Sequence, residues 1–222
     1  RLYPVGCSTW LADIASGSTA FQGIEVRAMP NPIDTEKYKP MDKGKARENL
    51  GLSADGTYIL FGAASPRIKR KGFAYLTEAL RRIEDRCQLL VYGTDAMPET
   101  AGLNVKALGK LDGGDLRSAY GAADVFVVPS LEDNLPNTVM EAMACGVPVA
   151  AFDAGGISDM IEHTRTGYLA RIRSGEDLAR GILWCMEHRQ ELGANARKKV
   201  ENCYAYSVAA QNYIKVYEEA LS

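Results

Sequence analysis

The sequence predicts an α/β fold: a doubly wound parallel sheet of about six strands, followed by C-terminal helices. Short apolar runs rich in β-branched residues, each about 4–8 residues long, are typical of buried parallel strands. Segments with a helical pattern separate these runs, which favours right-handed strand-helix-strand crossovers. After residue 170 the pattern becomes helical throughout.

The elements follow one another in a regular order. Strands are expected at residues 24–29, 58–62, 88–92, 104–108, 124–128 and 147–152. Helices are expected between them at residues 71–85, 112–122, 137–145 and 158–162, and then at residues 175–189, 189–203 and 207–221. In a sheet of this kind ligands bind beyond the carboxyl ends of the strands, near the point where the strand order reverses.

Bulk composition excludes several classes of function. With 26 basic and 28 acidic residues, the formal net charge is -2, so no overall field attracts nucleic acid or an acidic membrane. The five cysteines are odd in number and contain no C-x-x-C pair, which indicates a reduced, cytoplasmic protein. No run approaches the roughly 20 apolar residues of a membrane span, and we expect no signal peptide.

Residues 124–160 carry the most specific pattern, DVFVVPSLEDNLPNTVMEAMACGVPVAAFDAGGISDM. A buried strand leads through a polar loop into a helix that opens at Asn137 and Thr138. The N–H groups at a helix start favour phosphate, and the carboxylates of Asp133 and Glu141 can accept hydrogen bonds from sugar hydroxyls. A nucleotide sugar presents both kinds of group.

A basic loop follows the strand at residues 58–62. Lys71 precedes Gly72 at the expected helix start, and the residues before it include Arg67, Lys69 and Arg70. Such cations can pair with a diphosphate, although charged loops are often merely solvated. The loop is interpreted as a phosphate site.

Several segments in serial order resemble the family-4 glycosyltransferases of GT-B fold. Asp133, seven residues and Glu141 resemble the family's E-x7-E signature. The flanking matches are NPIDTEKYKP, LFGAASPRIKRKGFAYLTEAL, YGAADVFVVPS and GGISDMIEHTRTGYLA. The similarity covers most of the chain.

The resemblance implies a division into three parts. Residues 1–22 would be the trailing segment of an N-terminal domain, residues 23–205 a Rossmann-like donor-binding domain, and residues 206–222 a C-terminal crossover helix. The chain would then be the C-terminal half of the enzyme, without the N-terminal acceptor domain. We expect such a fragment to transfer no sugar by itself.

The resemblance also assigns roles to residues. Glu141 would bind the nucleotide ribose, Lys71 the diphosphate, and either Asp133 or Glu132 the sugar. Because Ala63 stands where relatives carry arginine, Arg67 or Arg70 would have to supply the second cation. The remaining donor contacts would come largely from backbone groups, at Gly93, Thr94, Leu108, Asn134, Leu135, Asn137 and Thr138.

The implied activity is retaining transfer of a sugar from a UDP-, GDP- or ADP-sugar to a glycan or lipid-linked acceptor, as in polysaccharide biosynthesis. No cofactor or obligatory metal is expected: the sequence has two histidines and no D-x-D motif. We expect a cytoplasmic protein, and peripheral contact of the missing domain with the inner face of the membrane stays open. Two alternatives also stay open, a nucleotide-sugar 2-epimerase and a non-catalytic nucleotide-binding module.

Overall fold

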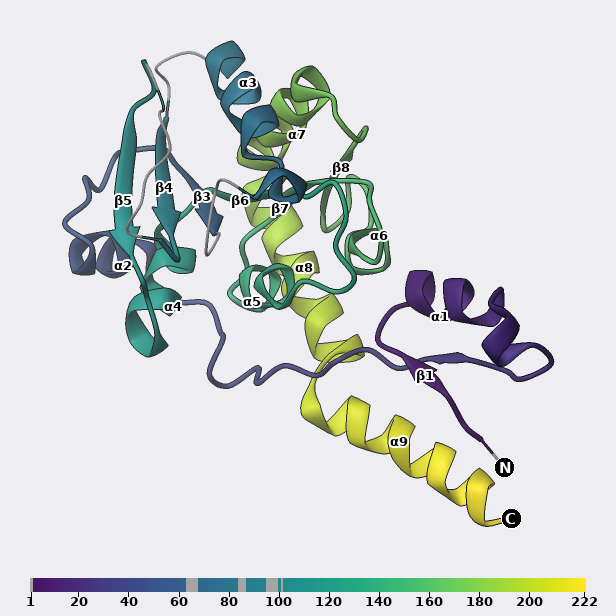
Figure 1. Cartoon of the computed structure of the whole chain (residues 1–222). Helices are drawn as coiled ribbons and strands as arrows, with labels where there is room; N and C mark the ends of the chain where they lie inside the picture. The colour runs from purple at the N-terminus through teal and green to yellow at the C-terminus, as the bar shows by residue number, and fades with distance from the viewer. Residues whose placement is uncertain (1, 63–67, 84–86, 95–99, 101) are drawn as a thin grey trace.

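A parallel six-stranded sheet forms the centre of the molecule (Figure 1). The computed structural model describes residues 2–62, 68–83, 87–94, 100 and 102–222. Within these residues the sheet has the order β5-β4-β3-β6-β7-β8. Its strands are β3 (Tyr58–Gly62), β4 (Gln88–Tyr92), β5 (Val105–Gly109), β6 (Val125–Val128), β7 (Val149–Phe152) and β8 (Gly167–Ala170). The predicted fold class is confirmed.

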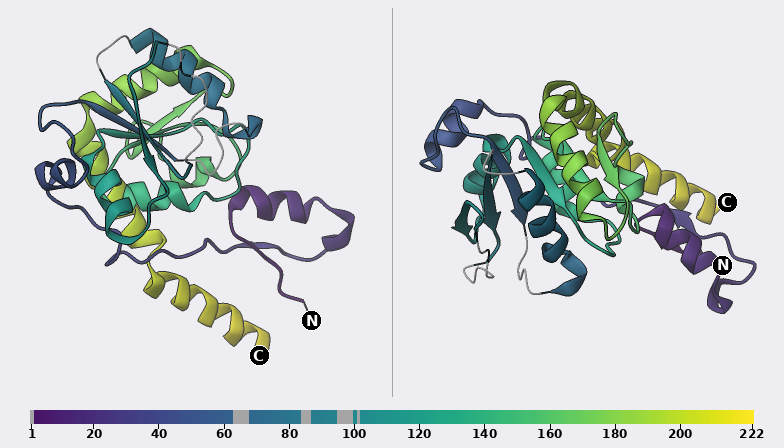
Figure 2. Two further views of the ribbon diagram at one scale, coloured as in Figure 1. Left: turned by 60° about the vertical axis from the view of Figure 1, so that its left-hand side comes forward. Right: turned by 90° about the horizontal axis from the view of Figure 1, so that it is seen from above.

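Helices cover both faces of the sheet (Figure 2). Alternate strand residues point to opposite faces, so Ile59 and Phe61 join one apolar core while Tyr58 and Leu60 join the other. The first core is closed by α3 (Phe73–Ile83) and α7 (Gly175–Glu187). The second is closed by α4 (Gly113–Ala122), α5 (Asn137–Ala144) and α8 (Arg189–Cys203). Burial on both faces explains why the central strands read as continuous apolar runs.

The strand order reverses between β3 and β6. From β3 the chain passes to β4 and β5 on one side, whereas from β6 it passes to β7 and β8 on the other. The loops that leave the carboxyl ends of β3 and β6 therefore diverge, and this is where open α/β sheets bind ligands. Both loops contain residues that the sequence singled out.

The expectation of a sheet strand at residues 24–29 is wrong. Within this stretch only β2 (Arg27–Ala28) is extended, and it pairs with β1 (Val5–Gly6) in a separate two-stranded sheet beside α1 (Thr9–Ser16) and the turn η1 (Thr19–Phe21). Glu25 and Arg27 would place charges inside a sheet that is covered on both faces. The sixth place belongs instead to β8, which is only four residues long and was not predicted.

The helices follow the prediction with small shifts at their ends. The helix expected from Lys71 begins at Phe73, because Gly72 has a φ of 68° and ends the preceding turn η2 (Lys69–Lys71). Its expected end at residue 85 lies outside the described residues. One helix, α2 (Lys43–Asn49), was not predicted, since it is rich in charge and buries only Ala46 and Arg47. The remaining helices are α6 (Ile157–Met160) and α9 (Tyr206–Leu221).

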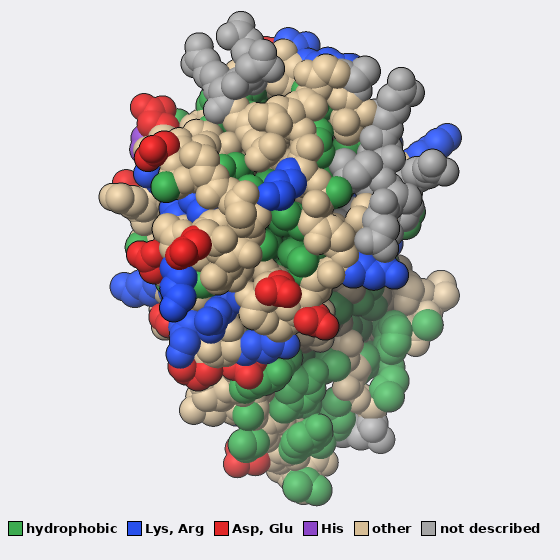
Figure 3. All heavy atoms as spheres, turned by 90° about the vertical axis from the view of Figure 1, so that its left-hand side faces the viewer, with side chains coloured by type: hydrophobic (Ala, Val, Ile, Leu, Met, Phe, Trp, Pro, Cys, Tyr) green, Lys and Arg blue, Asp and Glu red, His purple; other side chains and the backbone are tan. Residues whose placement is uncertain are grey.

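Apolar side chains gather at the end of the molecule formed by α9 (Figure 3). Along α9, Val216 is buried while Tyr217 is 62% exposed. Among the helices described, none combines the length and the apolar character needed to cross a membrane.

Candidate functional site

The loops after β3 and β6 are held together by their backbones. The N–H of Leu131 donates to the carbonyl of Arg70 at 2.7 Å. Gly72 approaches the loop after β6 so closely that a Cβ there would lie 1.7 Å from the carbonyl oxygen of Pro129. Only glycine combines this contact with a positive φ. The turn carrying Lys71 is therefore fixed against the loop carrying Asp133.

Lys71 and Asp133 form the centre of the candidate site. The Nζ of Lys71 lies 2.7 Å from Oδ2 of Asp133, and a guanidinium nitrogen of Arg70 lies 4.0 Å from the same oxygen. The side chains of Lys71 and Asp133 are 26% and 15% exposed. One carboxylate thus faces two cations, so the cluster keeps a positive balance that suits an anion. Glu132 is exposed, while Arg67 and Ala63 lie outside the described residues.

The loop of Asp133 is packed from its other side by the turn at Gly155 and Gly156. The N–H of Gly156 donates to the carbonyl of Asp133 at 3.0 Å. A Cβ on Gly155 or Gly156 would lie 2.2 Å or 1.7 Å from the backbone oxygens of Asp133 and Asn134. The two glycines form a turn, and nothing local in the sequence reports this close packing.

The side chain of Asn134 points to the N-terminal segment. Its Oδ1 accepts a hydrogen bond from Ser8 at 2.6 Å, and its amide donates to the sulfur of Cys7 at 2.8 Å. Leu135, the next residue, is buried. The side chains of these two loop residues are thereby engaged within the protein, so their predicted contribution to ligand binding rests with their backbone groups.

The start of α5 lies directly after this loop. Its N-cap is Pro136, which has no side-chain acceptor for the N–H groups of the first turn. Asn137 is exposed and Thr138 is half-buried. These N–H groups and the helix dipole provide a place for an anion near the Lys71 cluster.

Glu141 lies one turn into α5 and has its own set of partners. Its Oε2 accepts a hydrogen bond from the hydroxyl of Tyr120 at 2.7 Å, and that hydroxyl lies 2.7 Å from the hydroxyl of Tyr92. Burial raises the pKa of Glu141, while hydrogen bonds from Tyr120 and Tyr38 oppose the rise. Glu141 thus belongs to a different cluster from that of Lys71 and Asp133, along the same loop and helix.

The tyrosines around Glu141 were not predicted as site residues. Tyr92 directly precedes Gly93 and Thr94, and Tyr120 opens the YGAADVFVVPS segment, so both stand beside or within segments that the sequence singled out. Their hydroxyls meet through the fold, since neither is a sequence neighbour of Glu141. The sequence feature that could have pointed to these residues is a tyrosine in each of two segments that adjoin a strand.

The ends of β4 and β5 meet in an irregular register. Val91 pairs with Ala107 and Tyr92 pairs with Gly109, so Leu108 is an additional residue between the two pairs. An additional residue of this kind leaves backbone groups outside the ladder. Beyond it, Gly93 has a φ of 94° and donates to the carbonyl of Gly109 at 2.8 Å, and Thr94 is buried. Asp95, which follows Thr94 in the sequence, lies outside the described residues.

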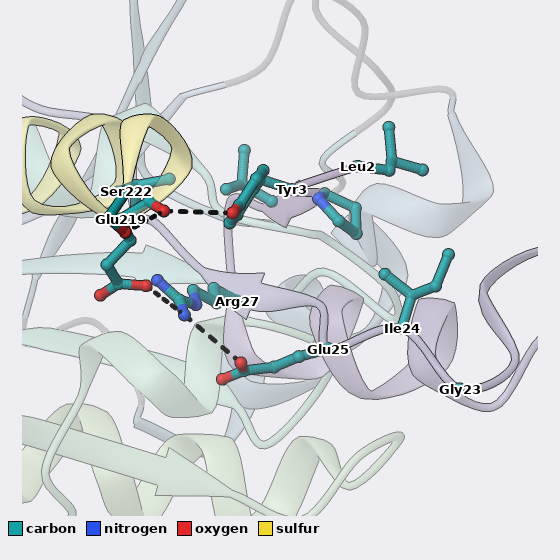
Figure 4. A pocket seen from close by; sticks show the side chains of 11 residues that line it. Leu2, Tyr3, Gly23, Ile24, Glu25, Arg27, Glu219 and Ser222 are labelled. Carbon is teal, nitrogen blue, oxygen red and sulfur yellow. Dashed lines mark hydrogen bonds and ion pairs between the residues drawn. The ribbon is translucent and has the colours of Figure 1, made fainter.

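The described chain also holds a cavity that lies apart from the predicted site residues. No group of three or more histidine, cysteine, aspartate or glutamate side chains that could hold a metal occurs among the described residues. A cavity of about 490 Å³ lies between the N-terminal segment and the end of α9 (Figure 4). Arg27, on its wall, is paired with Glu219 at 2.7 Å and with Glu25 at 3.4 Å. None of the predicted site residues lines this cavity.

The structure defines a parallel α/β domain with a cationic cluster and a helix start at the reversal of strand order. Residues 56–188 match the model of the glycosyl transferases group 1, and the chain belongs to this family. The sulfoquinovosyl transferase of Arabidopsis thaliana is 37% identical over 205 residues, which is 85% of this chain and 38% of that protein.

Solved structures agree on the fold. The sucrose-phosphate synthase of Thermosynechococcus elongatus superposes with a TM-score of 0.84 at 25% identity, covering 98% of this chain and 58% of that one. The Anabaena protein HepE, in complex with UDP, superposes with a TM-score of 0.81 at 23% identity, covering 98% and 64%. The chain spans about half the length of the curated relatives it matches, 49% and 50% for two of them.

Proposed function

We propose that this chain forms the donor-binding, C-terminal part of a family-4 retaining glycosyltransferase. The protein would move a sugar from a nucleotide-diphosphate sugar to a glycan or lipid-linked acceptor. The observation that carries the proposal is the convergence of Lys71, Asp133 and the start of α5 where the strand order reverses. Membership of the glycosyl transferases group 1 supports it.

The cationic cluster suits the diphosphate. The ammonium of Lys71 has three donors, so it can keep its bond to Asp133 and still donate to a phosphate oxygen. Arg70 and the N–H groups at the start of α5 add positive potential beside it. During transfer the departing nucleotide diphosphate gains negative charge, and fixed positive groups stabilise that charge.

The remaining parts of the nucleotide fit the neighbouring elements. Glu141 would accept hydrogen bonds from the ribose hydroxyls, and the backbone around Leu108 and Gly93 would hold the base. HepE, which shares this fold, was solved in complex with UDP and with UDP-glucose, which supports a nucleotide-sugar donor. We assign no metal to the site, and UDP-, GDP- and ADP-sugars are all candidates.

Calorimetric titration of variants tests this assignment. We expect the chain to bind UDP, GDP or ADP with a dissociation constant of roughly 0.1–1 mM. Glu141→Ala should weaken nucleotide binding by about 1–3 kcal/mol, because ribose hydroxyls lose a charged acceptor. Asp133→Ala should leave the free nucleotide bound and reduce sugar transfer by the full-length protein.

The exposed Glu48 of α2, which is not a candidate site residue, provides the matched control, since Glu48→Ala should alter neither property. Equal losses of nucleotide affinity in the Glu141 and Asp133 variants would contradict the division of roles. Absence of binding by any nucleoside diphosphate would contradict the donor site itself.

The transferase proposal is preferred to the two alternatives. The curated relative and the solved structures reported above include a transferase and a synthase, and none supports a 2-epimerase. Family membership favours an enzyme over a non-catalytic module. The acceptor, the N-terminal domain as a partner, and the cytoplasmic location remain predictions.

A further inference from the structure

The hydroxyls of Tyr92 and Tyr120 and the carboxyl of Glu141 form a buried chain of hydrogen bonds. Tyr92 is 7% exposed at the end of β4, and Tyr120 in α4 is fully buried. Their hydroxyl oxygens lie 2.7 Å apart, and that of Tyr120 lies 2.7 Å from Oε2 of Glu141. An ionised carboxylate only accepts hydrogen bonds, so Tyr120 must donate to it and is left to accept from Tyr92. The direction of the chain is thereby fixed.

The rings that carry these hydroxyls are held in place. Tyr92 packs across Gly62 at the end of β3, where a Cβ would lie 2.3 Å from a ring carbon. Tyr120 makes an edge-to-face contact with Phe126 of β6, with 5.5 Å between the ring centroids. The hydrogen-bonded chain therefore fixes the position of Glu141 relative to the ends of β3 and β4 and to β6. These strands surround the reversal of strand order.

We propose that Tyr120, supported by Tyr92, is a positioning residue that holds the Glu141 carboxylate ionised and oriented for the nucleotide ribose. The ribose contact itself rests on the proposed function. A carboxylate has about four acceptor positions, and Tyr120 occupies one of those on Oε2. The remaining positions are left to Tyr38 and to ligand hydroxyls. A chain of hydrogen bonds in a buried setting polarises its members, which strengthens the bond that reaches the carboxylate.

Among the described residues, few charged or titratable groups surround Glu141. Burial acts against its ionised form, and Tyr120, Tyr38 and the charge of Lys37 act in its favour. Cys145 lies nearby, and burial raises the pKa of its thiol to about 12, so it stays neutral. Burial also raises the pKa of Tyr120 well above its ordinary value, so that it remains a donor. Removing one phenol donor should therefore raise the pKa of Glu141.

The test uses Tyr120→Phe, which keeps the ring and removes the hydroxyl. The pKa of the Glu141 carboxyl is measured in the free chain by ¹³C NMR, with Glu141→Gln used to assign the signal. We expect a higher pKa in Tyr120→Phe than in the native chain, and a smaller rise in Tyr92→Phe. Tyr58→Phe is the matched control, because Tyr58 is equally buried and donates to the carbonyl of Ser53 at 3.1 Å instead.

Nucleotide binding provides the second readout, with UDP and GDP as probes. Tyr120→Phe should bind about tenfold more weakly at neutral pH, the effect of losing one hydrogen bond to a charged group. As the pH is lowered, the affinity of Tyr120→Phe for the nucleotide should begin to fall at a higher pH than the affinity of the native chain does. The nucleotide phosphate also titrates and so changes the affinity with pH. Because Glu141→Gln lacks the carboxyl, comparison with this variant separates the contribution of the phosphate from that of Glu141.

The outcomes separate this inference from the proposed function. An unchanged Glu141 pKa in Tyr120→Phe, or a loss of affinity no larger than in Tyr58→Phe, overturns the positioning role. If instead Glu141→Ala binds nucleotide as well as the native chain, the ribose assignment fails, whatever the NMR titration shows. A shifted pKa together with weakened binding supports both.

Discussion

At the scale of single residues, the candidate site depends on which oxygen and nitrogen atoms are left for a ligand. Lys71 is engaged by Asp133 through one oxygen, yet its ammonium keeps donor capacity. Glu141 is engaged by Tyr120 through one oxygen and keeps acceptor capacity. The internal bonds therefore orient both side chains without using them up.

Lys71→Met tests the phosphate role of the lysine, because methionine has a similar length and no charge. We expect the affinity for UDP to fall by about 1.5–3 kcal/mol, the contribution of a hydrogen bond to a charged group, while the affinity for uridine stays unchanged. Calorimetric titration with both ligands measures the difference. Lys69→Met, an exposed lysine on the same turn, is the control, and equal losses in the two variants would contradict the assignment.

Glu141→Gln tests the electrostatic setting of α5. Because burial raises the pKa of Glu141 in the folded chain, the native protein loses folding free energy as the pH rises from the unfolded pKa through the raised folded pKa. Glutamine does not ionise, so the variant should gain stability relative to the native chain between about pH 4 and about pH 8. Urea unfolding at both pH values measures this change. The same gain in Glu132→Gln, at an exposed position, would contradict the explanation.

Residue-level prediction from the sequence singled out Asp133 and Glu141 by their spacing and Lys71 by its basic loop before Gly72, and their roles stay predictions. It missed Tyr92 and Tyr120, because a hydroxyl gives no local signal of its partner. Tyr120 is separated from Glu141 by 21 positions and from Tyr92 by 28. Their contact is a product of strand order, which the sequence pattern does not specify.

At the scale of elements, five of the six sheet strands were predicted close to their observed bounds. The errors have different physical causes. Residues 24–29 have the apolar content of a strand, but charged Glu25 and Arg27 keep them out of a doubly covered sheet. The strand β8 is as short as β6 and β7, but its sequence GYLA contains no β-branched residue and begins with glycine, so it does not stand out before it pairs with β7. The extra residue at Leu108 likewise depends on pairing with β4, which no local pattern reports.

Gly156→Ala tests the packing of the loop at Asp133. The new Cβ would lie 1.7 Å from the carbonyl oxygen of Asn134, so either the glycine turn or the loop must move. We expect a loss of about 2–3 kcal/mol in unfolding free energy, as for overpacked interiors, with weaker nucleotide binding. Gly114→Ala is the control, since nothing lies within 4 Å and its helical position should gain up to about 1 kcal/mol. Equal stability of the two variants would show that the loop accommodates the change freely.

At the scale of the whole molecule, the N-terminal segment and the sheet domain meet at the candidate site. Ser8 caps α1 by accepting from the N–H of Leu11 at 3.0 Å and donates to Asn134 at 2.6 Å. The N–H of Thr9 donates to Asp159 of α6 at 2.6 Å. One buried serine thus joins the start of α1 to the loop that carries Asp133. The position of that loop depends on a segment more than 100 residues away in the sequence, since Ser8 and Asn134 are 126 positions apart.

A double-mutant cycle on Ser8 and Asn134 measures this coupling. Ser8→Ala loses a helix cap and a hydrogen bond, so we expect about 2 kcal/mol of destabilisation, and about 1 kcal/mol for Asn134→Ala. The double variant should be less destabilised than the sum by about 0.5–1 kcal/mol, because both changes remove the same bond. Urea unfolding of the four proteins gives the coupling energy.

The control cycle pairs Asn134→Ala with Ser174→Ala. Ser174 caps α7 through the N–H of Asp177 at 3.1 Å, and its hydroxyl is not bonded to Asn134. Its loss should therefore add to that of Asn134 without coupling, because residues without shared partners act independently. If the Ser8 cycle is additive as well, the bond between Ser8 and Asn134 does not link the N-terminal segment to the loop. Coupling confined to the Ser8 cycle would establish that the geometry at Asp133 is set jointly by both parts of the molecule.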